Sequence, residues 1–100
     1  MFARIWRGIA HTSVVEKYFH YVSERVIPAY RAARGCRDVW VLQQMQGEFT
    51  SLVLLSFWES RDAIESFADP QLESESRRDE RESLLAFEST AAVYEVMVVD

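Results

Sequence analysis

The sequence predicts an α+β protein in which helices cover one face of an antiparallel sheet. Four short runs have the composition of strands, and nearly all of them are apolar on both faces: Phe2–Ile9, Asp38–Gln46, Phe49–Trp58 and Ala92–Val99. A half-solvated strand alternates apolar and polar residues, so strands that are apolar on both faces need cover on both sides. A chain of 100 residues has helices enough for one face. We therefore expect a second copy of the chain to cover the other face.

Length, composition and charge limit the classes of protein. The 100 residues predict a single domain, spanning 1–100, and the 49% of hydrophobic residues can form a packed core. The formal net charge of −5 argues against nucleic acid or an anionic membrane as a partner, because both bind clustered Lys and Arg. The stretch from Met1 to Arg7 does not have the pattern of a signal peptide, and no uncharged stretch is long enough to span a bilayer. We expect a cytoplasmic protein.

A long helical region is expected after the first strand. It begins at Ser13-Val14-Val15-Glu16, which has the S-x-x-E form of a capping box. Apolar residues then recur at helical spacing: Val15, Tyr18, Phe19, Val22 and Val26. Pro28 lacks the N–H needed inside a helix, so we expect either a kink or a new short turn that starts near it. Gly35 predicts the helix end, because Gly tolerates the left-handed position after the last turn.

The rest of the chain predicts three more strands, with helical segments between the last two of them. Gln46-Gly47-Glu48 is expected to form a tight turn, and Ser60 to cap a short second helix that ends at Asp69-Pro70. Residues 72–83 are dense in Ser, Glu and Arg and predict a solvated helix whose end is anchored by Leu84, Leu85 and Phe87. The order β-α-β-β-α-β is the ferredoxin-like pattern, with helices on one face of an antiparallel sheet.

Three blocks carry a family resemblance. They are Ala3-Arg4-Ile5-Trp6-Arg7-Gly8, then Phe57-Trp58-Glu59-Ser60 leading into Ala63-Ile64-Glu65-Ser66-Phe67-Ala68, and Val93-Tyr94-Glu95-Val96. With these blocks in this order, the chain resembles the antibiotic biosynthesis monooxygenase superfamily of dimeric α+β barrels over essentially its whole length. The resemblance implies a homodimer whose two sheets form a barrel with a cavity in each half. It implies cofactor-free oxygenation of anthrones and quinols, haem degradation, or a role not yet assigned.

The haem-degrading branch can be tested residue by residue. Its members carry an Asn at the end of the first strand, a Trp in the second helix and a haem-ligating His further on. The nearest positions here hold Trp6, Phe67 and Arg77, and no His follows His20. The resemblance therefore implies no haem.

Few residues suit metal, nucleotide or thiol chemistry. One Cys and two His without ligand spacing predict no metal site, and the chain has no glycine-rich phosphate-binding motif. We therefore expect no cofactor. Cys36 lies close to Arg34 and Arg37, which could lower its thiol pKa, although a thiol without function is the simpler interpretation.

The resemblance directs attention to residues that could bind and deprotonate an aromatic molecule. A cofactor-free oxygenase must hold a flat, electron-rich substrate, help to remove its proton and stabilise the resulting anion. The predicted catalytic residues are Arg4, Trp6 and Tyr18. Arg4 and Trp6 share one face of the first strand and would bind and polarise the substrate. The predicted substrate-binding residues are Trp40, Trp58 and Tyr94, which would form aromatic walls.

Each candidate also has a purely structural interpretation. Arg4 could pair with Glu95 on a neighbouring strand. Trp58 and Tyr18 could fill the core, and Tyr94 could belong to the core or to a dimer contact. The sequence therefore supports two functions. One is a cofactor-independent monooxygenase of the antibiotic biosynthesis type, acting on a small anthrone-like or quinol-like molecule. The alternative is a non-catalytic ligand-binding or structural homodimer of the same fold.

Overall fold

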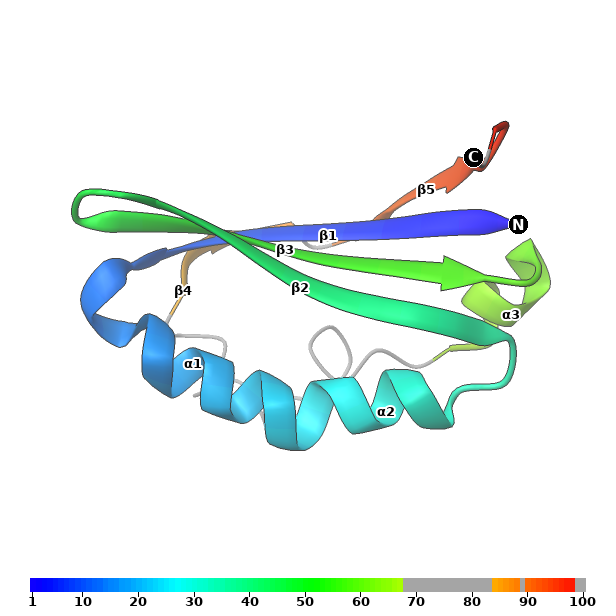
Figure 1. Cartoon of the computed structure of the whole chain (residues 1–100), viewed down its shortest axis with the longest axis horizontal. Coiled ribbons are helices and arrows are strands. Elements are labelled where there is room, and N and C mark those ends of the chain that lie inside the picture. The colour runs from blue at the N-terminus through cyan, green and yellow to red at the C-terminus, as the bar shows by residue number, and fades with distance from the viewer. Residues whose placement is uncertain (68–83, 89, 99–100) are drawn as a thin grey trace.

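The computed structural model describes residues 1–67, 84–88 and 90–98, and these form a five-stranded antiparallel sheet with helices on one face (Figure 1). The strands are β1 (Phe2–His11), β2 (Cys36–Gln46), β3 (Phe49–Trp58), β4 (Leu84–Phe87) and β5 (Ala92–Glu95). Their order is β2-β3-β1, and both β4 and β5 pair with the remaining edge of β1. The expected ferredoxin-like α+β class is thereby confirmed for the subunit.

The register around β1 determines which side chains share a face. β1 and β3 pair from Phe2 opposite Trp58 to His11 opposite Phe49. β5 pairs with the first half of β1, and β4 with the second half, where the register shifts between Ile9 and Ala10. The expected turn between β2 and β3 is confirmed, because Gly47 has a φ of +64°, a conformation that Gly adopts without steric cost.

The helical layer departs from regular α-helix just before Pro28. α1 (Val15–Tyr21) passes through a π-helical segment, η2 (Val22–Val26), into α2 (Ile27–Ala32). Pro28 stands in the first turn of α2, directly after this π-helical segment, and Val26 and Ile27 before it keep right-handed helical dihedrals. The chain therefore stays helical on both sides of Pro28 and departs from α geometry in the segment before it, close to where the sequence predicted an irregularity.

The expected capping box is not formed. The chain leaves β1 through a 3₁₀ turn, η1 (Thr12–Val14), so the residue that precedes α1 is Val14, and no side chain caps the helix. The hydroxyl of Thr12 instead donates to the Gly47 carbonyl oxygen at 2.9 Å, and it lies 2.9 Å from the Thr50 hydroxyl. The prediction from Ser13 was wrong because the tight turn begins one residue earlier and shifts the helix start beyond Ser13.

Gly35 turns the chain from the helical layer into the sheet. Its φ is +88°. The sequence predicted that Gly35 directly follows the helix end, but it lies two residues after the C-cap residue Ala33. A Cβ atom at Gly35 would lie 2.6 Å from the Ala63 Cβ, so the glycine also allows close packing against α3 (Arg61–Glu65).

The second half of the chain contains one confirmed cap and one correction. Ser60 caps α3 as predicted, and its Oγ accepts a hydrogen bond from the Ala63 backbone N–H at 3.1 Å. The predicted helix stop at Asp69-Pro70 and the predicted helix over 72–83 lie outside the described residues. Residues 84–87 form strand β4 and not a helix end, because their backbone pairs with β1 and a four-residue apolar run has no distinctive period.

The last strand is shorter than predicted. β5 ends at Glu95, although the Val96 N–H still donates to the Met1 carbonyl oxygen at 2.9 Å. Its pairing with β1 brings the two ends of the described chain to the same end of the sheet (Figure 1).

The two faces of the sheet differ in how they are covered. α1 and α2 lie against one face of the sheet (Figure 1). That face carries Trp6, Leu52 and Leu54, which are buried at 6% exposure or less. Ile9 of β1 and Trp40 of β2 lie on the opposite face and are 42% and 53% exposed. Within the described residues, the helices thus cover one face, and large apolar side chains are exposed on the other.

Candidate functional site

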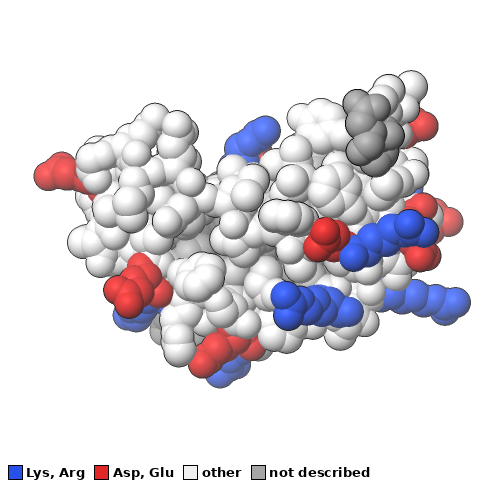
Figure 2. Space-filling model, viewed as in Figure 1, with Lys and Arg blue, Asp and Glu red and all other residues white. Residues whose placement is uncertain are grey.

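A cavity of about 460 Å³ lies between α1 and the sheet, on the helix-covered face. Its walls are formed mainly by apolar side chains from both layers, among them Trp6, Leu52 and Leu54 from the sheet and Val15, Tyr18 and Val22 from the helical layer. A cavity of this size, with apolar walls, is typical of sites for small molecules. In Figure 2 uncharged side chains cover most of this view of the molecule, and charged side chains lie mainly along its lower edge and over its right-hand part.

Polar groups are few among the residues that line the cavity. Glu16 is the one charged residue in the described lining, and it is exposed, so it lies where the cavity opens to solvent. Gln43 contributes an amide, and Thr12 a hydroxyl that is already hydrogen bonded to Gly47 and Thr50. The site therefore suits a largely apolar ligand with few polar groups.

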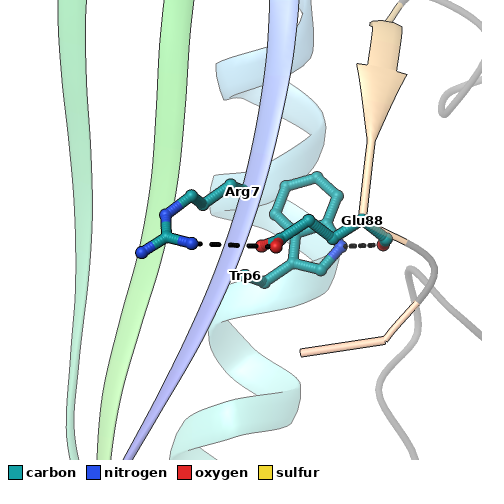
Figure 3. A network of polar contacts seen from close by, with 3 residues as sticks. All are labelled: Trp6, Arg7 and Glu88. Carbon is teal, nitrogen blue, oxygen red and sulfur yellow. Dashed lines mark hydrogen bonds and ion pairs between the residues drawn. The ribbon is translucent and has the colours of Figure 1, made fainter. Parts of the chain in front are cut away.

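Trp6 contributes its ring to the cavity wall and directs its N–H elsewhere. The residue is 1% exposed, and its indole Nε1 donates to the Glu88 backbone carbonyl oxygen at 2.8 Å (Figure 3). The Phe87 ring centroid lies 6.2 Å from that of Trp6. Because the N–H is bonded to the segment after β4, Trp6 offers a ligand an aromatic surface and not a hydrogen-bond donor.

Tyr18 is the second predicted catalytic residue at the cavity. It is 3% exposed, and its ring packs at 5.7 Å from the ring of Tyr21 in the same helix. Trp6 on β1 and Tyr18 on α1 therefore form walls of the same cavity, although they belong to different elements.

Arg4 points to a different part of the same sheet face. Its side chain is buried, its Nη1 donates to the Tyr30 hydroxyl, and its guanidinium carbon lies 5.7 Å from the Tyr30 ring centroid and 5.6 Å from that of Phe67. In the register, Arg4 lies opposite Val93, whereas Glu95 lies opposite Phe2. Arg4 is therefore part of an aromatic cluster next to α2 and does not line the cavity.

The three predicted substrate-binding residues lie outside the cavity lining. Trp58 is fully buried beside Tyr30 and Phe67, with ring centroids at 6.2 and 5.0 Å, and its indole N–H donates to the Ser56 hydroxyl at 2.8 Å. Trp58 therefore fills the core, which was the alternative to a substrate-binding role. Trp40 and Tyr94 are 53% and 51% exposed on the face of the sheet that the helices do not cover.

Sequence reasoning missed Glu16 and Gln43 as cavity residues. Both had a usable signal. Glu16 is one turn before Phe19 and His20 at the edge of the helical stripe, and Gln43 follows Val41 at the two-residue period of a strand face. Glu16 was instead assigned to the capping box, which is not formed.

Metal and thiol chemistry receive no support from this part of the molecule. Within residues 1–67, 84–88 and 90–98, no group of three or more His, Cys, Asp or Glu side chains could hold a metal ion. Burial raises the pKa of the Cys36 thiol; backbone hydrogen bonding at Asp38 lowers it by less, and the charge of the Asp38 carboxylate raises it further. The alternative of a lowered thiol pKa next to Arg34 and Arg37 is therefore not supported. In the same residues no helix has the length and apolar character needed to cross a membrane.

Solved structures with the same architecture cover nearly the whole chain. A Bacillus cereus protein assigned to the antibiotic biosynthesis monooxygenases superposes with a TM-score of 0.70 at 17% identity, over 99% of this chain and 95% of that one. ActVA-Orf6, a monooxygenase from Streptomyces coelicolor solved with nanaomycin D, superposes with a TM-score of 0.69 at 17% identity, over 99% and 89%. The chain has the antibiotic biosynthesis monooxygenase fold.

A further neighbour with this antibiotic biosynthesis monooxygenase fold is SnoaB, a cofactor-independent oxygenase from Streptomyces nogalater. It superposes with a TM-score of 0.67 at 16% identity, over 98% of this chain and 94% of that one. No protein-family model matches the sequence, and no curated protein does. The three likenesses are at most 17% identical, so they establish the architecture of the subunit.

Proposed function

We propose that this protein is a cofactor-independent monooxygenase that acts on a small aromatic molecule of the anthrone or quinol type, bound in the cavity between α1 and the sheet. The observation that carries the proposal is the cavity of about 460 Å³, with Trp6 and Tyr18 in its walls and polar groups near its opening. A flat aromatic molecule would bury its rings against these walls. Two neighbours of the same fold are named as oxygenases, which supports the choice of reaction.

The reaction requires a base and molecular oxygen. A base removes a proton from the activated CH₂ or OH group of the substrate, and the resulting anion transfers electrons to O₂. For an anthrone, the CH₂ group is oxidised to a carbonyl, one oxygen atom enters the product and the other leaves as water. We assign the base to the Glu16 carboxylate, because it is the charged group in the described lining of the cavity.

One observation favours a binding protein without turnover. The indole N–H of Trp6 is bonded to Glu88, and Arg4 lies in the other cluster, so two of the predicted catalytic groups do not present donors to the cavity. A protein that binds an aromatic ligand without oxidising it would need the same apolar walls and no base. The two functions differ in oxygen consumption, not in binding.

Oxygen uptake with anthrone as the probe separates the two functions. We expect the wild type to consume one O₂ per anthrone oxidised, and Glu16→Gln to lower the rate by about 100-fold or more, because the amide cannot accept the proton. Glu24→Gln, an exposed position on η2 away from the cavity, serves as the matched control and should leave the rate unchanged. Binding of anthrone without oxygen uptake would establish the non-catalytic alternative, and absence of binding would contradict both.

We further infer that a second copy of the chain covers the open face of the sheet. Support comes from the large apolar side chains on that face, among which Trp40, Leu42 and Tyr94 are 43% to 53% exposed. Burying them between two sheets would remove a contiguous apolar surface from water. Light scattering coupled to size exclusion should give about twice the chain mass of 11.7 kDa, and Trp40→Glu should shift it toward the monomer. A wild type of monomer mass at micromolar concentration would contradict this arrangement.

A further inference from the structure

We propose that Gly8 determines the size of the ligand that the cavity accepts, because it provides the surface on which the Trp6 ring rests. The inference builds on the proposed function, in which an aromatic molecule binds against Trp6. The dimension concerned is the space between the Trp6 ring and α1, and the evidence is the set of contacts around that ring.

The Trp6 ring lies against the backbone of Gly8. The two residues are separated by one position on β1, so they share the helix-covered face of the sheet. A Cβ atom built on Gly8 would lie 3.0 Å from Cη2 and 3.4 Å from Cζ3 of Trp6, both in the six-membered part of the indole. Glycine in a strand often marks such a close approach. Any larger residue at position 8 would therefore have to displace the ring.

The ring is held at its other edge by the segment that follows β4. The Trp6 N–H donates to the Glu88 carbonyl oxygen (Figure 3). The ring of Phe87 packs beside the indole, with the two ring centroids 6.2 Å apart. Glu88 is itself tied to β1, because its N–H donates to the Arg7 carbonyl oxygen at 2.9 Å and its carboxylate Oε2 lies 3.7 Å from the Arg7 Nη1. Lateral movement of the indole would break this hydrogen bond.

The direction left to the ring leads into the cavity. A side chain on Gly8 would project from the sheet toward the helical layer, beneath the ring, and would lift the ring away from the sheet. Val15, Tyr18 and Val22 line the cavity from the helical side. Each increment of size at position 8 would therefore narrow the space between Trp6 and α1. A ligand with several fused rings would lose affinity before a ligand with one ring.

The test is the affinity of two probes of different size, anthrone and hydroquinone, measured by calorimetry. We expect Gly8→Ala to weaken anthrone several-fold and Gly8→Val to weaken it by about tenfold or more, while hydroquinone binds as to the wild type. The control is the same pair of substitutions in the Trp6→Phe background. Phe lacks the ring atoms that contact position 8, so there the substitutions should change anthrone affinity by less than about twofold.

The outcomes separate the inference from the function on which it rests. Equal anthrone binding by the wild type and Gly8→Val would overturn the inference alone, as would an equal loss of both probes or an equal loss in the Trp6→Phe background. Failure of the wild type to bind either probe would overturn the proposed function and the inference with it. Thermal unfolding of each variant identifies any that does not fold. If Gly8→Val does not fold, the anthrone affinities of Gly8→Ala in the wild-type and Trp6→Phe backgrounds provide the test.

Discussion

At one end of the helix-covered face, Tyr30, Trp58 and Phe67 pack with ring centroids 4.6 to 6.2 Å apart, whereas at the other end Trp6 and Tyr18 border a cavity of about 460 Å³. The same strand, β1, supplies a side chain to each end. The difference lies in the helical layer. α2 places a fully buried Tyr30 against Trp58, while α1 and η2 place the smaller Val15 and Val22 above the sheet near Trp6.

Two tryptophans on this face have different roles although they are the same type of residue. Trp6 and Trp58 are both buried on the same face of neighbouring strands, and each donates its N–H to a protein oxygen. One forms a cavity wall and the other fills the core, because different helical residues lie opposite them. The filled end should respond to substitution through stability, and the open end through ligand binding.

The largest effect is expected for Trp58→Ala at the filled end. Trp58 is fully buried, and its removal would leave a void that the rings of Tyr30 and Phe67 cannot close. We expect the free energy of unfolding to fall by about 3–5 kcal/mol, measured by urea denaturation. Phe19→Ala, at a half-exposed position on α1, should cost about 0.5 kcal/mol. A small cost at Trp58 would show that this end is not packed as described.

Tyr30→Phe tests the buried charge of Arg4 at the filled end of the helix-covered face. The substitution keeps the ring and removes the hydroxyl that accepts the hydrogen bond of Arg4. Because a buried charged donor loses a partner, we expect the free energy of unfolding to fall by about 1–3 kcal/mol. Tyr94→Phe, on the exposed face, is the matched control and should change it by about 0.5 kcal/mol at most. Equal effects of the two variants would contradict the assigned role of the Tyr30 hydroxyl.

A pair of valines on β2 compares the two ends directly. Val39 and Val41 are both half-buried on the helix-covered face, but only Val41 lines the cavity. Val39→Phe should lower the free energy of unfolding by about 1–3 kcal/mol, because its surroundings are already filled. Val41→Phe should cost less than about 1 kcal/mol and abolish anthrone binding, because the new ring enters the cavity. Denaturation and calorimetry on both variants would reveal any reversal of this pattern.

The smallest effect concerns the Cys36 thiol, at the start of β2. Its pKa is raised by burial, so the folded protein binds the thiol proton more tightly than the unfolded chain does. Stability should therefore fall slightly as the pH rises through the pKa of the unfolded thiol, and be unaffected by Cys36 below it. Alkylation by iodoacetamide at neutral pH should be slower in the folded protein than in urea. Faster reaction in the folded state would contradict the direction of the shift.

Local signals in the sequence predicted most of the elements. The apolar runs that became β1, β2 and β3, the Gly47 turn and the Ser60 cap each depend on a few neighbouring residues. The capping box at Ser13 and the helical end at residues 84–87 failed, because in both places a contact with a distant segment outweighed the local preference. Thr12 bonds to the turn between β2 and β3, and β4 pairs with β1.

The candidate site was predicted only in part for a related reason. Trp6 and Tyr18 both line the cavity, whereas Arg4 and Trp58 share the face of Trp6 but lie at the filled end. The alternation of a strand identifies the face on which a side chain lies. It does not identify which helical residue lies opposite at each point along that face.

Periodicity, caps and turn residues act over a few positions, so the sequence predicts β1, the helical region, β2, β3 and the start of α3 in order, and the face that each of their strand residues occupies. Where the helix-covered face is filled and where it is open depends instead on packing between elements. At the filled end the large side chain of Tyr30 packs against the sheet, and at the cavity the smaller Val15 and Val22 face it. These helical residues and the strands they face are far apart in the sequence. Gly8 shows the same dependence, because its lack of a side chain matters only where the Trp6 ring rests on it.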